Sequence, residues 1–214
     1  MELFVKNYPS EIIGYFSTLD RKYEIYKINF NGVNICLAYA LLGGPNAAVI
    51  EELVAMGCKK FLLVGSGGEL NKEIARGKII IISSAVRDEG TSYHYIKPSR
   101  EIGIDPTIVG NIEYYFEKNK IPYITGKTWT TDAFYRETKN KYELRKSEGC
   151  ICVEMECAGF AAVAQYNNAA FAQIIYGGDC LDGIKWDMRE WSEYSREERR
   201  YWILEQSMEI IQAM

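Results

Sequence analysis

The chain has 214 residues, and 25 Lys and Arg against 29 Asp and Glu give it a formal net charge of −4. Hydrophobic residues make up 48% and charged residues 25% of the sequence, which is the balance of an ordinary globular protein and excludes wholesale disorder. The length suits one domain, residues 1–214, with a full hydrophobic core. The mild acidity predicts neither a nucleic-acid partner nor an anionic membrane surface as a partner.

Further classes are excluded by what the sequence lacks. It holds no run of roughly 20 apolar residues, as a membrane helix needs, and its N-terminus shows no signal-peptide pattern. The six Cys form no CxxC pair, so we expect reduced thiols in a cytoplasmic protein. Since His94 is the single histidine, a His-rich metal site is excluded and we expect no metal.

The first half of the chain predicts alternating strands and helices. Asn31-Gly32 is a typical hairpin turn, and the apolar alternation on both sides of it predicts two strands. Gly57 ends a helix with one apolar face, and two apolar runs that follow indicate buried strands. The predicted elements are strands at 23–30 and 33–41, a helix at 46–57, and strands at 60–64 and 78–82.

The second half continues the alternation and ends in a long helix. Ser195 precedes two glutamates and is the predicted N-cap of that helix. The predicted elements are a helix at 106–120, an extended segment at 122–129, a polar helix at 135–149, a strand at 151–153, a helix at 155–166, a strand at 171–176 and a helix at 196–212. This order predicts an α/β fold in which helices flank a central mixed, mostly parallel β-sheet. Ligand sites of such folds lie beyond the carboxyl ends of the strands.

A glycine-rich turn, Val64-Gly65-Ser66-Gly67-Gly68, follows one of the predicted buried strands. Glycines let the backbone approach a ligand closely, and successive N–H groups can hold an anion. The same pattern also occurs in tight strand-to-loop turns that bind nothing, and this alternative stays open.

Carboxylates mark two further predicted strand ends. Glu154 and Glu156 flank Met155 in the segment VEMECAG, residues 153–159, and a carboxylate there can accept hydrogen bonds from vicinal hydroxyls such as those of a ribose. The alternative is a solvated acidic helix start. Asp179 follows two glycines and is placed to act as a general acid or as an acceptor for a ligand ring, or else caps its own turn.

A fourth motif, TTDAFY at residues 130–135, lies at another strand-to-helix junction. Asp132 suits the N-cap position of the following helix. Phe134 can cover the face of a base or a sugar.

Taken together, these motifs resemble a known family. The turn at 64–68, the segment at 153–159 and Asp179 occur in the order found in the nucleoside phosphorylases of the purine nucleoside phosphorylase and uridine phosphorylase superfamily, which also contains nucleosidases. The resemblance covers residues 26–173 well and the last helix loosely. It implies a nucleoside phosphorylase-like fold, shortened at its N-terminus, and a pentosyltransferase reaction in which phosphate cleaves an N-glycosidic bond to give a free base and ribose 1-phosphate.

The resemblance also implies a role for each matching residue. Asp179 corresponds to the catalytic acid near purine N7, and Arg199 to the arginine that assists it. Glu156 corresponds to the residue that holds the ribose hydroxyls, Met155 to the one that packs on the sugar, and Phe134 to the aromatic residue beside the base. The predicted substrate-binding residues are Phe134, Glu154, Met155, Glu156 and Gly178, and the predicted phosphate-binding residues are Gly65, Ser66, Arg87 and Arg21.

The residues after Phe134 bear on the choice of base. Uridine phosphorylases place a Gln and an Arg there to read the uracil edge, and they generally lack an acidic residue at the Asp179 position. Here the next residues are Tyr135-Arg136-Glu137-Thr138, so the Gln and Arg pair is absent. Both points favour a purine nucleoside.

The phosphate ligands depart from the family pattern. Leu63 stands where the family usually has an Arg, and the family's Gly-Asp-Pro loop with its Arg has no counterpart in the sequence. In the family, a neighbouring subunit supplies a further Arg to the phosphate site. Arg21 lies at about the corresponding distance before the Asn31-Gly32 turn. Arg87 can compensate from its own loop, or it pairs instead with Asp88, with Glu89 or with another loop.

Several functions therefore stay open. The first is a purine-type phosphorylase with phosphate as co-substrate and no cofactor. The alternatives are a uridine-type phosphorylase, a nucleosidase in which water replaces phosphate, and a catalytically silent nucleoside-binding relative. Because a neighbour completes each site in the family, we expect a homo-oligomer, either a dimer or a hexamer.

Overall fold

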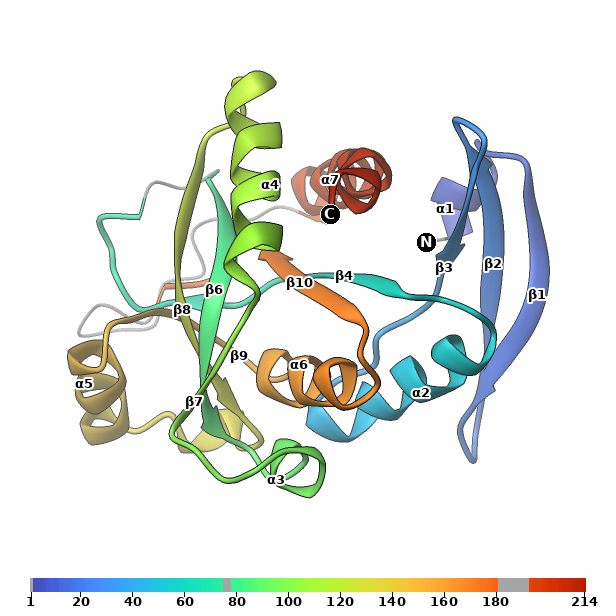
Figure 1. The fold of residues 1–214 in the computed structure, drawn as a ribbon. Helices are drawn as coiled ribbons and strands as arrows, with labels where there is room; N and C mark the ends of the chain where they lie inside the picture. Colours follow the sequence, from blue (N-terminus) through green and yellow to red (C-terminus); the bar gives the residue numbers. More distant parts are fainter. Residues whose placement is uncertain (1, 75–77, 181–192) are drawn as a thin grey trace.

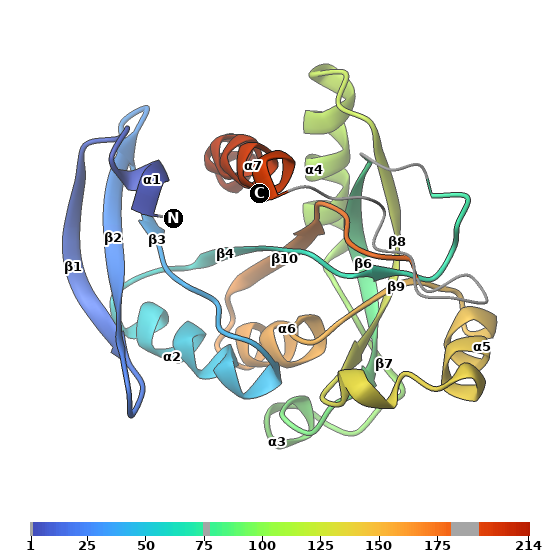
Figure 2. The same cartoon turned by 180° about the vertical axis from the view of Figure 1, so that it is seen from behind.

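The computed structural model describes residues 2–74, 78–180 and 193–214 (Figure 1). Three strands near the N-terminus form an antiparallel sheet of their own: β1 (Ser10–Ser17), β2 (Lys22–Phe30) and β3 (Val33–Leu37). The predicted hairpin is confirmed, because Asn31 and Gly32 both have positive φ, 50° and 80°, as a type I′ turn requires. The second strand ends at Leu37 rather than at residue 41. Figure 2 shows this N-terminal sheet at one side of the molecule.

The remaining strands of the described residues form the central sheet. They are β4 (Lys60–Gly65), β5 (Gly68–Glu69), β6 (Ile79–Asp88), β7 (Glu101–Gly103), β8 (Tyr123–Thr131), β9 (Cys150–Glu154) and β10 (Ala170–Ile175). Their order is β4-β10-β6-β8-β9-β5, with β7 paired to β6. The longer ladders, β4–β10, β6–β8 and β8–β9, are parallel, and the short ladders β6–β10, β5–β9 and β6–β7 are antiparallel. The prediction of a central mixed, mostly parallel sheet is confirmed.

The first and last strands of this order are neighbours in the chain. β4 ends at Gly65 and β5 begins at Gly68, so only Ser66 and Gly67 separate them. The sheet therefore curls round on itself, and the end of β9 lies beside the turn between β4 and β5. This closure brings strand ends from both margins of the sheet to one place.

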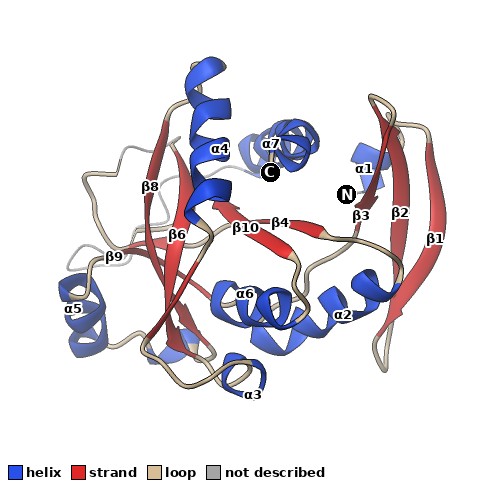
Figure 3. Ribbon diagram, in the orientation of Figure 1, coloured by secondary structure: helices blue, strands red, loops and turns tan. Residues whose placement is uncertain are grey.

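Helices cover both faces of β4 and β10, with α4 and α7 on one side and α2 and α6 on the other (Figure 3). The helical segments are α1 (Glu2–Val5), η1 (Gly44–Ala47), α2 (Ala48–Ala55), α3 (Ser92–Tyr95), α4 (Pro106–Lys118), η2 (Phe134–Arg136), α5 (Lys139–Ser147), α6 (Cys157–Tyr166) and α7 (Glu193–Ala213). The predicted α/β fold with flanking helices is thus confirmed. The N-terminal sheet packs through a small cluster of its own onto α1 and α7.

Capping residues explain two helix boundaries. The carboxylate of Asp105 accepts the N–H of Thr107 at 2.8 Å, and a proline occupies the first position of α4. At the other boundary Gly57, with φ 98°, follows α2 in a Schellman turn, in which the N–H of Cys58 donates to the carbonyl of Leu53 at 2.9 Å. Both signals are local, which is why the sequence predicts these ends closely.

Two helices differ from the predictions. The polar helix predicted at 135–149 is divided into the 3₁₀ turn η2 and the shorter helix α5. The last helix begins at Glu193, so Ser195 lies within it and is not its N-cap. A capping pattern is common on exposed helix surfaces, and it does not by itself mark the first residue.

The helix α6 and the strand β6 lie at the centre of the core. The side chains of Ile79–Ile82 are fully buried, and so is nearly every residue of α6 from Cys157 to Ala164. Small residues let α6 approach its neighbours closely: a Cβ atom on Gly159 would lie 3.1 Å from the backbone of Gly44. The start of η1 is therefore packed against α6.

Candidate functional site

Three of the predicted motifs meet where the sheet closes. A Cβ atom on Gly67 would lie 2.5 Å from the carbonyl oxygen of Val153, and one on Gly178 would lie 2.0 Å from the carbonyl oxygen of Gly67. Side chains do not tolerate such contacts, so glycine is what lets the three backbones come together. The N–H of Glu69 also donates to the carbonyl of Asp179 at 2.8 Å. The glycine-rich turn, the acidic motif and the Gly-Gly-Asp motif therefore form one structural unit.

Glu154 lies at the end of β9 with only 4% of its surface exposed. Its Oε2 accepts the N–H groups of Glu156 and Cys157, both at 2.7 Å, and its Oε1 accepts the hydroxyl of Thr130 at 2.6 Å. Two further side chains donate to it at 3.3 Å. Burial raises the pKa of Glu154 to about 7, and the charge of Glu156 adds to the rise. The sequence predicts Glu154 as a substrate-binding residue. In the structure both of its carboxylate oxygens accept hydrogen bonds from groups of the protein.

Glu156 is the N-cap residue of α6 and is half-buried. Its Oε1 accepts the N–H of Gly43 at 2.7 Å, from the loop between β3 and η1. Burial raises the pKa of Glu156, and the hydrogen bond from Gly43 opposes the rise. A carboxylate offers about four acceptor positions, so Glu156 keeps capacity for two hydroxyl groups. Met155, also half-buried, stands between the two glutamates.

Asp179 follows β10 and is half-buried, and a second carboxyl group lies close to it. Burial raises the pKa of Glu137 to about 7, and the charge of Asp179 adds to the rise. Glu137 is the C-cap residue of η2, three residues after Phe134, and its N–H lies 3.5 Å from the Phe134 carbonyl oxygen. The Phe134 ring is 43% exposed. An aromatic ring and two carboxyl groups thus border one region.

The last helix reaches the Gly-Gly-Asp motif. The Nε of Arg200 donates to the hydroxyl of Tyr176 at 3.1 Å, shortly before Asp179 in the chain. Arg199, the residue next to it on α7, is half-buried. The structure therefore places Arg199 on the part of α7 that contacts the segment carrying Asp179.

Gly65 and Ser66 lie at the closure of the sheet, and the Ser66 side chain is exposed there. Arg21 lies elsewhere: it is exposed at the turn between β1 and β2, with its guanidinium 5.0 Å from the centre of the Tyr23 ring. It belongs to the N-terminal sheet, which Figure 1 shows apart from the strand ends that carry the motifs. Within one chain the structure does not bring Arg21 together with Gly65 and Ser66.

Arg87 lies on β6 and is only 1% exposed. Its Nε donates to the hydroxyl of Ser92 and its Nη1 to that of Ser99, each at 2.8 Å, and its guanidinium lies 4.1 Å from the centre of the Tyr93 ring. Its Nη2 is buried and has no hydrogen-bond partner among the described residues. The sequence predicts Arg87 in a loop, whereas the structure places it on β6, held by the loop that follows this strand, with Nη2 as a remaining donor. The pairing with Asp88 or Glu89, left open by the sequence, is not among the ion pairs of the described residues.

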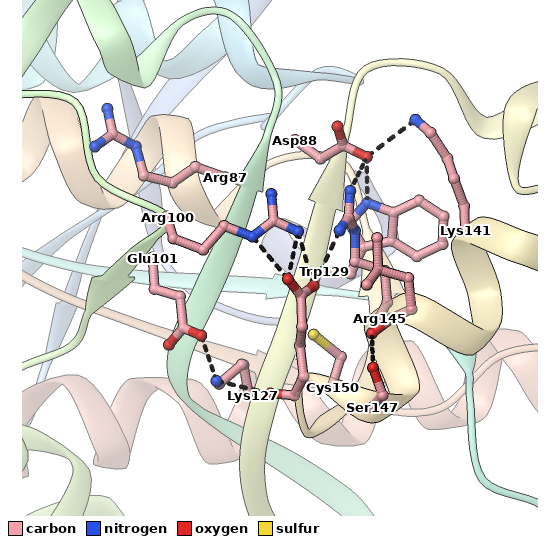
Figure 4. Close-up of polar contacts among 12 residues, drawn as sticks. Arg87, Asp88, Arg100, Glu101, Lys127, Trp129, Lys141, Arg145, Ser147 and Cys150 are labelled. Atoms are coloured by element: carbon pink, nitrogen blue, oxygen red, sulfur yellow. Dashed lines mark hydrogen bonds and ion pairs between the residues drawn. The ribbon is translucent and has the colours of Figure 1, made fainter.

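A charge network fastens α5 to the sheet (Figure 4). One oxygen of Asp88 accepts hydrogen bonds from Trp129 and Arg145, both at 2.9 Å, and from Lys141 at 3.1 Å. The Arg145 side chain is 4% exposed and has Glu148 as a second partner at 2.9 Å. Phe134 and Glu137, which border the candidate site, lie just before α5 in the chain. By holding α5 against the sheet, this network also helps to hold these two residues in position.

Replacing Asp88 by Ala is expected to lower the free energy of unfolding by about 2 kcal/mol, since it leaves a buried guanidinium and an indole N–H short of a partner. Burial raises the pKa of Asp88, but the hydrogen bonds from Arg145 and Lys141 outweigh burial and hold it below the ordinary value of 3.8. The contribution is therefore present above about pH 4 and is lost as the pH falls further. Denaturant unfolding at neutral and acid pH measures both effects. Lys141→Ala, which removes a half-exposed partner of the same oxygen, is the control and is expected to cost less than about 1 kcal/mol.

Sequence reasoning missed two residues that the structure brings to the site. Glu137 is one of the residues that stand where uridine phosphorylases have the Gln and Arg pair, and its spacing of three from Phe134 is the one signal that relates it to the site. Gly43 contributes a backbone N–H, which any residue type carries. Its only signal is a Gly-Gly-Pro run before a predicted helix.

In the ranges that the structure describes, no group of three or more His, Cys, Asp or Glu side chains is arranged to hold a metal ion. Across those same ranges, no helix combines the length and the apolar character needed to span a membrane. The expectation of a metal-free site stays a prediction.

Comparison with known proteins identifies the family. The family model described as the phosphorylase superfamily matches residues 1–212. The chain is 35% identical over 116 residues to the uridine phosphorylase of Thermococcus kodakarensis, which covers 54% of this chain and 42% of that protein. It is 26% identical over 147 residues to the guanosine phosphorylase of Halorubrum lacusprofundi, with coverage of 68% and 61%. It is also 24% identical over 172 residues to the purine nucleoside phosphorylase of Plasmodium vivax, with coverage of 78% and 69%.

The chain spans about half the length of the first relatives it matches, 42% of one and 61% of the other. The family match is nearly complete along the chain itself. It also agrees with the convergence of the glycine-rich, acidic and Gly-Gly-Asp motifs at the closure of the sheet. The protein belongs to the phosphorylase superfamily.

Proposed function

We propose that this protein is a nucleoside phosphorylase that cleaves the N-glycosidic bond of a purine nucleoside with phosphate, giving the free base and ribose 1-phosphate. The observation that carries the proposal is the glycine-mediated contact of three backbones, which places Glu156 and Asp179 on one structural unit. The names of the relatives span uridine, guanosine and purine nucleosides, so they support the reaction more than the base.

In the proposed mechanism each carboxyl group has a separate task. Glu156 accepts hydrogen bonds from the two ribose hydroxyls and so fixes C1′ for attack. Asp179 gives a proton to the leaving purine, which gains negative charge as the bond to C1′ breaks, and Arg199 assists it. Phe134 covers the base, and Met155 packs on the sugar. Glu154 acts as a positioning residue, because its oxygens hold the N–H groups at the start of α6.

Phosphate is proposed to bind at the turn of Gly65 and Ser66, where the backbone and an exposed hydroxyl are available. Arg87 is buried and retains one donor at Nη2, which supports a role in balancing the charge of the anion. Arg21 is proposed to act only across a subunit interface, because in its own chain it lies at the turn between β1 and β2, apart from Gly65 and Ser66.

A purine is proposed because an acid at position 179 can protonate N7, an atom that a pyrimidine lacks. The second carboxyl group, Glu137, lies beside Asp179 and follows Phe134 by one turn. It is therefore placed to meet the polar edge of the same base. A base with N–H groups on that edge matches a carboxylate acceptor.

Product analysis tests the function. The protein is incubated with inosine, adenosine, guanosine and uridine, each with and without phosphate, and the free base is measured. Release of purine that requires phosphate supports the proposal. Equal release of base without phosphate would instead indicate a nucleosidase. Phosphate-dependent release from uridine alone would indicate a uridine-type phosphorylase. No release, together with a higher melting temperature in the presence of a nucleoside, would indicate a nucleoside-binding protein.

Glu137 makes the activity sensitive to pH near neutrality. Its carboxyl group changes charge about pH 7 next to Asp179, so kcat/KM for the purine nucleoside is expected to show an inflection there. Glu137→Gln cannot ionise and is expected to remove the inflection. The measurement is the pH profile of kcat/KM, with Glu143→Gln on the exposed surface of α5 as the matched control. An unchanged inflection in Glu137→Gln would contradict a place for Glu137 at the base.

We further propose a homo-oligomer, a dimer or a hexamer, with no cofactor besides the phosphate co-substrate. Large apolar side chains near the site are exposed in the single chain, among them Leu42 at 68%, Phe134 at 43% and Tyr135 at 89%. A neighbouring subunit would cover them and complete the site. Light scattering of the purified protein tests this, and a strict monomer would contradict it. The cytoplasmic location expected from the sequence also stays a prediction.

A further inference from the structure

The loop between β6 and α3, residues 89–91, carries a buried carboxylate, Glu89, that has no part in the proposed mechanism. Glu89 is 6% exposed. Its Oε2 accepts the N–H of Ser92 at 2.9 Å, and its Oε1 accepts the hydroxyl of the same serine. That hydroxyl also accepts the Nε of Arg87 at 2.8 Å, and Figure 4 shows the Arg87 side chain directed away from Asp88. One hydroxyl thus joins a buried carboxylate to a buried guanidinium, which holds the loop in one conformation.

The same loop is also fastened to the segment that carries the proposed base-binding ring. The N–H of Gly90 donates to the Oδ2 of Asp132 at 2.8 Å. The sequence suits Asp132 to a helix N-cap, but Ala133 is the N-cap residue of η2 and receives no help from a side chain. Asp132 stands two residues before Phe134. The loop is therefore anchored both to β6 and to the start of η2.

Glu89 faces a pair of buried glycines, Gly43 and Gly44. A Cβ atom on Gly44 would lie 3.2 Å from the Oε2 of Glu89 and 3.2 Å from the Oγ1 of Thr91. From α6, a Cβ atom on Gly159 would lie 3.1 Å from the backbone of Gly44. Gly44 is therefore enclosed between the loop after β6 and the helix α6.

The glycine pair in turn holds Glu156. Gly43 has a φ of 90°, a backbone conformation that favours glycine, and its N–H donates to the Oε1 of Glu156 at 2.7 Å. Two adjacent glycines have many accessible conformations, so the packing around Gly44 is what keeps this N–H in place. A line of contacts thus runs from Glu89 through the two glycines to the Glu156 carboxylate.

We infer that Glu89 is a positioning residue for sugar recognition, and that it sets the preference for a ribonucleoside over a 2′-deoxyribonucleoside. The inference rests on the proposed function, in which Glu156 accepts the ribose hydroxyls. Glu89 acts through Gly44 and not by contact with the substrate. When Glu89 is shortened, the glycine pair gains room and the Glu156 carboxylate rotates more freely. The hydrogen bond that the 2′-hydroxyl adds is then weakened, because its acceptor is no longer held in one orientation.

Sugar preference is the first test, measured as kcat/KM for inosine relative to 2′-deoxyinosine at saturating phosphate. Wild type is expected to prefer inosine by at least about tenfold, since the 2′-hydroxyl donates to a charged acceptor. Glu89→Ala is expected to lower this preference at least about threefold, mainly through a higher KM for inosine, with the KM for phosphate unchanged. Asp105→Ala, which removes a carboxylate that accepts a backbone N–H at the start of α4, is the matched control and is expected to keep the preference. An unaltered preference in Glu89→Ala would overturn the inference.

Hydrogen exchange of the Gly43 amide is the second test, and it needs no substrate. This amide is expected to exchange at least about tenfold faster in Glu89→Ala than in wild type, and within about twofold of wild type in Asp105→Ala. Gly44→Ala keeps Glu89 and its partners but crowds the same contact, so it is also expected to speed the exchange. Absence of phosphorolysis in wild type would contradict the proposed function, whereas unchanged exchange at Gly43 in the folded variants would overturn the positioning by Glu89.

Discussion

Asp179→Asn is expected to lower kcat/KM for phosphorolysis of the purine nucleoside by about 100- to 10,000-fold, the usual range for the loss of a general acid. Asparagine keeps the shape and a hydrogen-bonding group but has no proton to give. The base then leaves with its negative charge unrelieved, so the loss appears mainly in kcat. Initial rates at saturating phosphate, with the nucleoside varied, separate kcat from KM.

Asp20→Asn is the matched control for this prediction. Asp20 is exposed at the turn between β1 and β2, where it accepts the hydroxyl of Thr18 at 2.8 Å. Its replacement is expected to change kcat/KM less than about twofold, as for a surface residue outside the site. Thermal unfolding of both variants shows whether the fold is intact. A kcat/KM for Asp179→Asn within about threefold of wild type would exclude Asp179 as the acid.

Glu154→Ala is expected to lower the free energy of unfolding by about 4 kcal/mol. It leaves two N–H groups at the start of α6 and the hydroxyl of Thr130 without their acceptor, at about 1–3 kcal/mol each, and it opens a cavity beside them. For a chain of this length that change corresponds to a melting temperature lower by roughly 10 °C. Denaturant and thermal unfolding measure it.

Glu154→Gln separates the hydrogen bonds from the charge. The amide oxygen can accept the two N–H groups, and the amide nitrogen can donate to Thr130, whose hydroxyl rotates to accept. The variant is therefore expected to lose less than about 1.5 kcal/mol. A loss as large as that of Glu154→Ala would mean that the carboxylate charge itself is required.

The pH dependence of stability provides a second readout for Glu154. Its pKa in the folded protein is raised to about 7 from 4.5, so the folded state binds the proton more tightly than the unfolded chain. The stabilisation is complete below the unfolded value and is lost as the pH rises through about 7. Between about pH 5 and about pH 8, wild type is expected to lose up to about 3 kcal/mol relative to Glu154→Gln. Parallel curves for the two proteins would contradict the raised pKa.

Local signals account for the parts of the fold that the sequence predicts. The Asn31-Gly32 hairpin and the ends of the helices near Asp105 and Gly57 depend on backbone conformations that a few neighbouring residues determine. The apolar run at Ile79 predicts a buried strand because a strand that is covered on both faces has apolar residues at every position. This pattern is visible without knowing which strands lie beside it. The hairpin and the two helix ends are close to their predicted positions, whereas the strand predicted at 78–82 continues to Asp88.

Long-range pairing accounts for what the sequence does not predict. Nothing near Gly65 or Gly68 indicates that β4 and β5 lie at opposite margins of one sheet, or that the hairpin belongs to another sheet. The same applies to the site. Its motifs are readable in order, but the proximity of Glu137 to Asp179 arises only from the closure of the sheet.

The burial of α6 links substrate binding to folding. Every residue of α6 from Cys157 to Ala164 is buried, so the helix is stable only after the sheet and the start of η1 have formed around it. Glu156 is its N-cap residue, so in a partly unfolded chain the carboxylate proposed to bind the sugar is not in place. A nucleoside that uses Glu156 binds the native state alone, and at one hundred times its Kd it adds about 2.7 kcal/mol to the free energy of unfolding. If the proposed site binds a nucleoside, the bound chain is expected to be cleaved more slowly by proteases that act on the unfolded state.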